Sequence, residues 1–154
     1  MARAAFDGAR QVADADCPPN MALEIELLAA EMVEAEKLLA ATAYLFVCPE
    51  NLANMSGVMK DMFDRCYYPV LGHIEGRVYA TMIAAGSDGE GAERQIDRIV
   101  TGWRLRRVAD SVIINLAAQE PEEILAPKNL SINQINKCTE VGTAMAEGIT
   151  LRIF

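Results

Sequence analysis

The sequence predicts a single α/β domain over residues 1–154, in which a parallel β-sheet lies between two layers of helices. Segments with strand patterns alternate with segments of helical periodicity, which is the order of βαβ units. Two central segments are apolar on both alternating sets of side chains, as in a sheet covered on both faces. A chain of 154 residues is long enough to bury one core. The expected strands are residues 22–28, 43–48, 77–85 and 110–117.

The first part of the chain contains two predicted helices and one predicted edge strand. Residues 1–13 place small and apolar side chains along one side of a helix, and residues 14–20 contain two consecutive prolines that make a connection. Residues 22–28 alternate leucine and isoleucine with glutamate, which is typical of a half-exposed edge strand. Residues 31–41 form a short helix that leads to the first central strand.

A strand, a polar loop and a helix follow. Residues 43–48 are a short apolar run that predicts a buried strand. Pro49 has no N–H for the ladder and the nearby asparagines favour turn backbone, so residues 49–55 are predicted to form a loop. Ser56 or Asn54 then caps an amphipathic helix. The apolar positions of this helix are Val58, Met59, Met62, Phe63 and Cys66.

The second half of the chain repeats this order. Residues 77–85 are another nearly continuous apolar run, and a glycine-rich loop follows at residues 86–91. An amphipathic helix leads to the last strand at residues 110–117. After a short acidic turn, Asn129 or Ser131 caps the final helix.

The two central strands each lead into a polar loop that precedes a helix. Open α/β sheets bind ligands at the carboxyl ends of their strands, where helix N-termini also begin. We therefore expect a ligand between residues 49–56 and residues 86–91. Glycines in the second loop allow backbone N–H groups to approach a ligand. Ordinary strand-to-helix turns are the alternative interpretation of this spacing.

Two blocks of residues match a known family. The first block consists of Pro49, Asn54-Met55-Ser56-Gly57, Met59-Lys60, Phe63 and Asp64-Arg65. The second block is Ala84-Ala85-Gly86-Ser87-Asp88-Gly89-Glu90-Gly91. Together they resemble the flavodoxin-like NAD(P)H-dependent FMN reductases and quinone oxidoreductases. The similarity continues in order to the last helix, so it covers nearly the whole chain.

The resemblance implies an FMN cofactor, NAD(P)H as electron donor and a small-molecule acceptor such as a quinone or a flavin. The first loop would border the isoalloxazine ring and ribityl chain, and the second would pack along the other side of the ring. No catalytic acid–base pair is required, because the flavin carries the hydride. The implied cofactor-binding residues are Pro49, Glu50, Asn51, Leu52, Asn54, Met55, Ser56, Gly86, Ser87, Asp88, Gly89 and Gly91.

The sequence departs from the family in two ways. Leu52 stands where relatives often carry an aromatic residue, and Ala53 where a glycine is common. A flavodoxin-like sheet has five strands in the order 2-1-3-4-5, and the first strand, with the Ser/Thr/Gly-rich loop that wraps the FMN phosphate, is missing here. Relative to the family, the chain is therefore expected to be truncated at its N-terminus. Residues 22–28 would lie as an edge strand beside residues 43–48, or an oligomer would cover the gap.

The missing loop predicts weak FMN binding. Each hydrogen bond to a charged phosphate is worth about 1.5–3 kcal/mol. Losing three of them could cost more than about 4 kcal/mol, which is roughly a thousandfold in affinity.

Composition excludes several classes of function. The net charge of −8 and the lack of a basic stripe argue against nucleic acid as a partner. No apolar run has the length of a membrane span and the first residues do not form a signal peptide, so a cytoplasmic location is expected. The four cysteines are far apart and His73 is the only histidine, so no metal site is expected.

Three functions remain compatible with the sequence. The preferred one is an FMN-dependent NAD(P)H oxidoreductase of flavin or quinone reductase type. In this interpretation, the start codon assigned to the sequence lies downstream of the true start codon. The second is a flavin-free, truncated remnant that acts as a structural or interaction protein. The third is a flavodoxin-like electron carrier.

Overall fold

The computed structural model describes residues 1–15 and 22–154, and these form two compact units. One unit is Leu28–Lys128, and the other joins Met1–Leu27 to Asn129–Phe154. Of the connection predicted at residues 14–20, residues 14 and 15 continue the first helix, and the remaining residues lie outside the described part of the chain.

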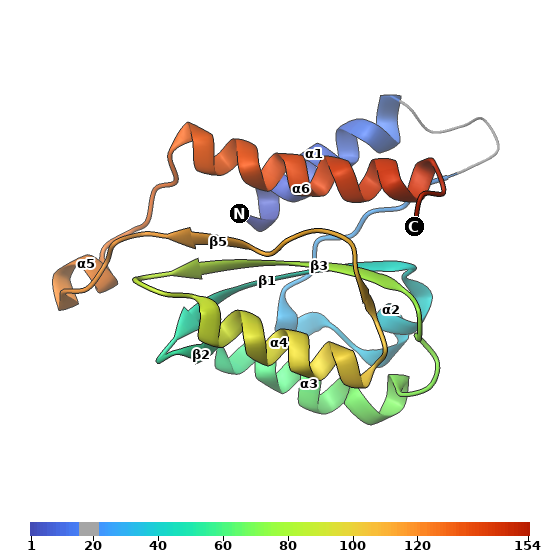
Figure 1. Cartoon of the computed structure of the whole chain (residues 1–154), viewed down its shortest axis with the longest axis horizontal. Coiled ribbons are helices and arrows are strands. Elements are labelled where there is room, and N and C mark those ends of the chain that lie inside the picture. The colour runs from blue at the N-terminus through green and yellow to red at the C-terminus, as the bar shows by residue number, and fades with distance from the viewer. Residues whose placement is uncertain (16–21) are drawn as a thin grey trace. The chain divides into compact units, whose positions relative to one another are not determined.

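The larger unit is built on a mostly parallel sheet with β3 in its middle (Figure 1). β1 pairs with β3 from Ala43 opposite Val78 to Pro49 opposite Ala84. On the other side of β3, β4 and β5 pair in turn, also in parallel. This sheet confirms the predicted α/β fold class. The strands are β1 (Ala43–Asn51), β2 (Asn54–Met55), β3 (Val78–Ala85), β4 (Arg106–Arg107) and β5 (Val112–Asn115).

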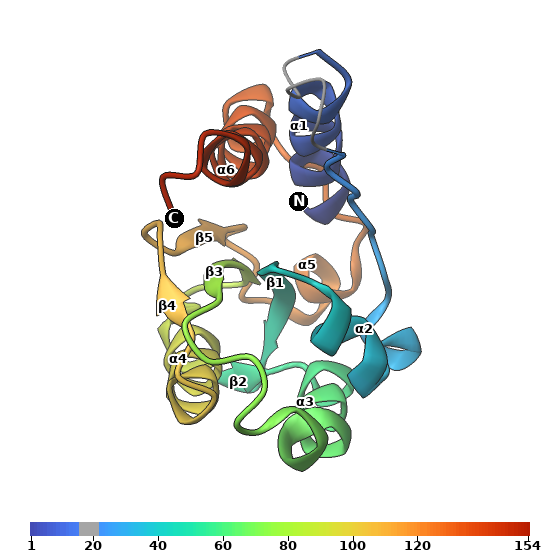
Figure 2. The same cartoon turned by 90° about the vertical axis from the view of Figure 1, so that its right-hand side faces the viewer.

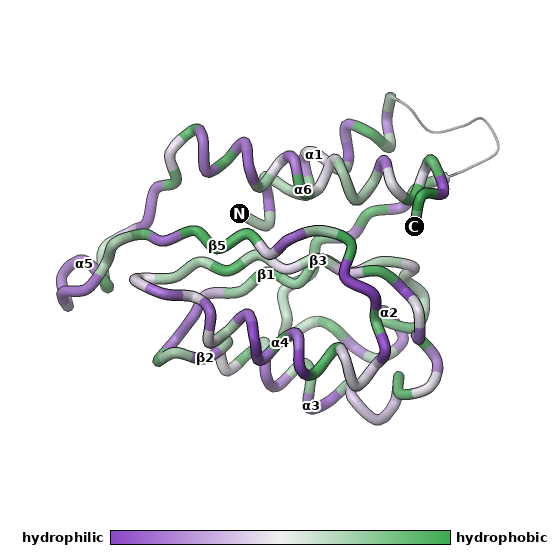
Figure 3. The backbone as a smooth tube through the Cα atoms, viewed as in Figure 1, coloured by the Kyte–Doolittle hydropathy of each residue, from purple (hydrophilic) through white to green (hydrophobic). Residues whose placement is uncertain are grey.

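Two amphipathic helices, α3 and α4, cover one face of this sheet (Figure 2). Figure 3 shows hydrophilic and hydrophobic residues alternating along α4. Apolar side chains of both helices meet those of β1 and β3 in one core, as the helical periodicity requires. The helical segments of this unit are a 3₁₀ turn, η1 (Ala30–Met32), and the helices α2 (Ala35–Ala40), α3 (Gly57–Val70), α4 (Glu90–Gly102) and α5 (Pro121–Leu125).

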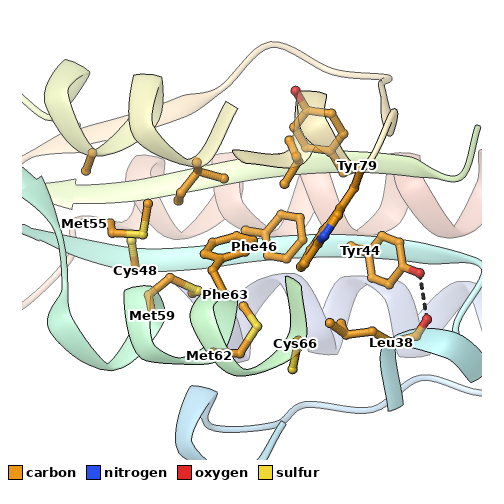
Figure 4. Close-up of a cluster of buried hydrophobic side chains, with 14 of the residues drawn as sticks. Leu38, Tyr44, Phe46, Cys48, Met55, Met59, Met62, Phe63, Cys66 and Tyr79 are labelled. Atoms are coloured by element: carbon orange, nitrogen blue, oxygen red, sulfur yellow. Dashed lines mark hydrogen bonds between the residues drawn. The ribbon is translucent and has the colours of Figure 1, made fainter. Parts of the chain in front are cut away.

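Aromatic side chains form the centre of this core (Figure 4). The ring of Phe63 lies 5.2 Å from that of Phe46 and 5.3 Å from that of Trp103, centroid to centroid. Trp103 is completely buried, and its indole N–H donates to the carbonyl oxygen of Tyr67 at 3.1 Å. A buried tryptophan needs such a partner for its N–H. The core therefore fixes both helices on the strands that carry the two loops.

Two arginines fasten the segment that precedes β1. The guanidinium of Arg65, on α3, donates to the carbonyl oxygens of Val33 at 2.8 Å and Ala30 at 3.1 Å. The guanidinium of Arg77 donates to the carbonyl oxygen of Leu38 at 2.9 Å. Leu38 lies near the end of α2, where carbonyl groups have no partner within the helix. Both arginines thus satisfy backbone groups that a short helix or turn leaves open.

The edge strand predicted at residues 22–28 is wrong. Residues 22–29 form no helix or strand, and the helix predicted at residues 31–41 is divided into η1 and α2. Alternating side chains indicate an extended chain, but a strand also needs a neighbour with which its N–H and C=O groups pair. Among the described strands, only β3 and the two-residue β2 pair with β1.

The predicted start of the first loop at Pro49 is also wrong. β1 continues to Asn51, and Pro49 lies within it. At this point β1 is the edge of the described sheet. An edge strand accepts a proline because one side of the strand has no ladder that needs the missing N–H.

The smaller unit pairs α1 (Ala2–Ala15) with α6 (Ile132–Thr150), which confirms the first and last predicted helices. The hydroxyl of Ser131 accepts from the backbone N–H of Gln134 at 3.3 Å, and the Gln134 side chain accepts from the N–H of Ser131 at 2.8 Å. This capping box confirms Ser131 as the predicted cap. No helix in the described part of the chain is long and apolar enough to cross a membrane.

Candidate functional site

Three loops meet at the edge of the sheet where β1, β3 and β5 end (Figure 1). Parallel strands end at one edge, so the loops that follow them become neighbours. The N–H of Ala118 donates to the carbonyl oxygen of Gly86 at 3.0 Å, which joins the loop after β5 to the loop after β3. The loop after β1 contacts the loop after β3 at the N-terminus of α4.

The first loop is a tight β-hairpin. Leu52 and Ala53 link β1 to β2 with φ angles of 52° and 61°. Positive φ at both central positions is typical of a type I′ turn, which favours Asn-Gly because other residues are strained there. Leu52 is 96% exposed, and its carbonyl oxygen accepts from the Asn54 side chain at 2.9 Å. The tip of the hairpin therefore carries an exposed leucine, and its backbone is strained at Leu52 and Ala53.

Replacing Ala53 with glycine is expected to raise the free energy of unfolding by about 0.5–1 kcal/mol. Glycine adopts positive φ without strain, although its more flexible unfolded chain offsets part of the gain. Urea denaturation measures the change. The matched control is Ala126→Gly, at an exposed position with φ of −65°, where we expect a loss of about 0.5–1 kcal/mol. A loss in both variants would contradict the strain at the hairpin.

Glu50 links the first loop to the N-terminus of α4. One carboxylate oxygen of Glu50 accepts from the N–H of Gly89 at 2.7 Å, and the other from the N–H of Ala92 at 3.3 Å. Gly89 is the N-cap residue of α4, and because glycine has no side chain it cannot cap the helix itself. A carboxylate suits this place because the N-terminus has unpaired N–H groups and a partial positive charge. Glu50 therefore caps a helix that begins 40 residues later in the chain.

Gln95 makes a second link between the same elements. Its side-chain oxygen accepts from the N–H of Met55 at 3.0 Å, and its side-chain nitrogen donates to the Asn54 side chain at 2.7 Å. Gln95 lies on α4, whereas Met55 and Asn54 form β2. Four hydrogen bonds through two side chains thus join the first loop to α4.

The glycines of the second loop pack against other loops. A Cβ atom at Gly91 would overlap the carbonyl oxygen of Ala53, and one at Gly86 would lie 2.6 Å from the carbonyl oxygen of Ala118. Gly89 has a φ angle of 94°, which side chains rarely adopt. From the sequence we expected these glycines to let a ligand approach the backbone. In the structure, Gly86 and Gly91 instead allow the backbones of neighbouring loops to approach one another.

The predicted site residues divide into exposed and buried sets. Met55 and Ser56 are each 4% exposed, and Pro49 is part of a strand. Ser56 occupies the predicted N-cap of α3, but its hydroxyl has no hydrogen-bond partner in the described part of the chain. The exposed members are Pro49, Asn51, Leu52, Asn54, Ser87 and Asp88.

Sequence reasoning missed Gln95 and the loop after β5. In that loop the Asn115 side chain donates to the carbonyl oxygen of Ser87 and accepts from the N–H of Ala117 at 2.7 Å. Asn115 is the last residue of β5, within the strand predicted at residues 110–117, so the rule that located the first two loops could also have indicated the third near this strand's end. Gln95 could not be found this way, because its partners lie 40 and 41 residues before it.

Cys48 is a buried cysteine within β1. Burial raises the pKa of its thiol, and a hydrogen bond from the Ser56 backbone lowers it by less. The raised pKa disfavours the thiolate form of Cys48 at neutral pH.

One protein-family model matches most of the chain. The family model described as NADPH-dependent FMN reductase matches residues 12–119, which include both predicted loops. No curated protein sequence matches the chain significantly.

Solved structures resemble the whole chain. A flavodoxin from the domain Archaea has a TM-score of 0.67 and 14% identity over 96% of this chain and 86% of that one. Rubredoxin oxygen:oxidoreductase from Desulfovibrio gigas has a TM-score of 0.71 and 11% identity, covering 99% of this chain and 33% of that one. An NADPH-quinone reductase from P. pentosaceus has a TM-score of 0.55 and 14% identity, over 94% and 88%. At these identities the likeness shows a flavodoxin-like fold.

Proposed function

The chain belongs to the NADPH-dependent FMN reductase family, and from this premise we propose that it is an FMN-dependent oxidoreductase. In this proposal it takes electrons from NADH or NADPH and passes them to a small-molecule acceptor such as a quinone or a free flavin. The observation that supports it most is the meeting of both family-matched loops at the carboxyl edge of the sheet. Bound flavin supplies the hydride transfer, while the protein supplies binding, orientation and electrostatics.

The exposed residues of the two loops suit the flavin ring. Asn51 and Leu52 at the hairpin offer an amide and an exposed apolar side chain, and Ser87 and Asp88 offer polar groups from the second loop. Leu52 can pack against the face of a flat ring, and the three polar side chains can hydrogen-bond its edge and fix its orientation. These residues would border the ring and fix its orientation.

The phosphate of FMN fits the described residues less well. The N–H groups of Gly89 and Ala92 at the N-terminus of α4 are already bound to Glu50. Between residues 22 and 42 the structure has an extended segment, η1 and α2, and no strand followed by a glycine- or serine-rich loop. We propose that the ring supplies most of the binding energy in this chain.

The test is to titrate the purified chain with FMN and with riboflavin, which lacks the phosphate. We expect both to bind with dissociation constants within about tenfold of each other, whereas three phosphate bonds would favour FMN by roughly a thousandfold. NADH and NADPH oxidation at saturating FMN, with a quinone as acceptor, tests the reaction. If neither flavin binds, or if reduced nicotinamide is not consumed, the proposed function is wrong.

The same contacts favour one other candidate, a flavin-free interaction protein. Glu50 occupies the helix N-terminus as an internal anion, so α4 is complete without a ligand. Chain that is purified without flavin absorbance and stays unchanged on titration would support this candidate. A third candidate, an electron carrier, would bind flavin without oxidising NADH or NADPH directly.

A further inference from the structure

The Glu50 carboxylate and the Gln95 amide both hydrogen-bond between the first loop and α4. We propose that Glu50 is a positioning residue, which fixes the second loop relative to the first and thereby sets the slot for the flavin ring. This inference rests on the proposed function. It gives Glu50 a role that differs from the direct cofactor contact implied by the family resemblance.

Both carboxylate oxygens of Glu50 already accept hydrogen bonds from the backbone. They bind the N–H groups of Gly89 and Ala92 at 2.7 and 3.3 Å, so neither is directed at a ligand. Without the carboxylate these two N–H groups would lose their partners at the start of α4. Unpaired N–H groups at a helix start favour local opening of the first turn.

The second loop depends on this first turn. Gly89 is the N-cap residue of α4 and directly follows Ser87 and Asp88, the exposed residues that would border the ring. Movement of the first turn would therefore displace both. Gly91 has no room for a side chain because the Ala53 backbone lies against it, so the hairpin and the helix start move together.

The charge of Glu50 also selects the part of the ligand that these loops accept. A carboxylate at the helix N-terminus cancels the partial positive charge that would attract a phosphate. The loops therefore offer no unpaired helix N-terminus to a phosphate, and the carboxylate of Asp88 lies beside them, so the part of the ligand that they suit is the isoalloxazine ring. FMN and riboflavin should depend on Glu50 to the same extent.

The experiment compares Glu50→Ala, Glu50→Gln and Gln95→Ala with the wild-type chain. Amide hydrogen exchange without ligand reports the opening of α4 at Gly89 and Ala92. We expect Glu50→Ala to raise the exchange rate at both amides about tenfold. It should also weaken the binding of FMN and of riboflavin about tenfold each, because the loss of one helix cap has an effect of this size. Glu50→Gln should fall between it and the wild type, because the amide keeps one acceptor oxygen. Gln95→Ala should raise exchange at Met55.

A matched control separates positioning from stability. Ser131→Ala removes the cap of α6 in the smaller unit and should lower stability by a similar amount, with Gly89 exchange and flavin affinity unchanged. Unchanged exchange in Glu50→Ala would overturn the coupling. Raised exchange at Gly89 and Ala92 with unchanged affinity for both flavins would overturn the positioning role. A loss of affinity for FMN but not for riboflavin would also overturn it. If the wild type binds neither flavin, the proposed function is wrong, and Glu50 cannot position a flavin ring. Amide exchange in Glu50→Ala would still show whether Glu50 couples the two loops.

Discussion

Replacing Gly142 with alanine is expected to lower the free energy of unfolding by about 3 kcal/mol. Gly142 lies on α6, where the backbone of α1 passes directly over it. A Cβ atom at this position would overlap the carbonyl oxygen, carbonyl carbon and Cα of Ala5. These are backbone atoms, so no side chain can rotate away, and the two helices must separate. Forced separation of packed elements costs about 1–3 kcal/mol, and a backbone clash lies at the upper end or above.

Gly57→Ala is the matched control for this change. Gly57 is the first residue of α3, and a Cβ atom there would have no neighbour within 4 Å. Because alanine is the better helix former, we expect this variant to be neutral or more stable by up to about 1 kcal/mol. Thermal and urea denaturation followed by circular dichroism measure both variants. Equal stability of Gly142→Ala and the wild type would show that α1 and α6 are not in close contact.

Hydrophobic periodicity correctly predicted the elements whose apolar side chains are buried in the core. The apolar runs at residues 43–48 and 77–85 became β1 and β3, because such residues need a covered position in a parallel sheet. The alternating segment at residues 22–28 did not become a strand. Its side-chain pattern fits an edge, but the pairing partner of an edge strand lies elsewhere in the chain and leaves no local signal.

The place of the candidate site could be predicted, whereas its internal contacts could not. The switch-point rule located both loops from strand ends and helix starts alone. The rule does not say that Glu50 turns inward to cap α4, since that contact spans about 40 residues and depends on the tight hairpin at Leu52 and Ala53. A polar residue in a predicted ligand loop can therefore be a structural partner of the next loop.

Replacing Arg107 with methionine is expected to lower the free energy of unfolding by about 2 kcal/mol at pH 7. The guanidinium contacts a carboxylate oxygen of Glu93 at 2.5 Å and one of Asp97 at 2.8 Å. It also donates to the Ser111 hydroxyl at 2.5 Å, and Tyr79 donates its hydroxyl to Asp97. Breaking a buried ion pair costs about 3–5 kcal/mol, and the 29% exposure of Arg107 reduces this cost.

The loss in Arg107→Met should depend on pH in a defined direction. Burial acts to raise the pKa of Asp97, but hydrogen bonds from Tyr79 and Arg107 outweigh it, so the pKa lies below its usual value. A lowered pKa stabilises the fold above the unfolded-state pKa of about 4, and this stabilisation is lost as pH falls through the folded-state pKa. The difference between variant and wild type should therefore be largest near pH 7 and should shrink below about pH 4.

Urea denaturation at pH 7, 5 and 3 gives the three values that this prediction needs. Arg98→Met is the matched control, because Arg98 lies exposed on α4 and forms no ion pair with the described residues. We expect it to change the free energy of unfolding by less than about 0.5 kcal/mol at each pH. A loss in Arg107→Met that stays constant from pH 7 to pH 3 would show that the lost stability comes from packing of the arginine stem. A loss that shrinks with acid would assign it to the carboxylates, which join α4 to β3 and the loop before β5.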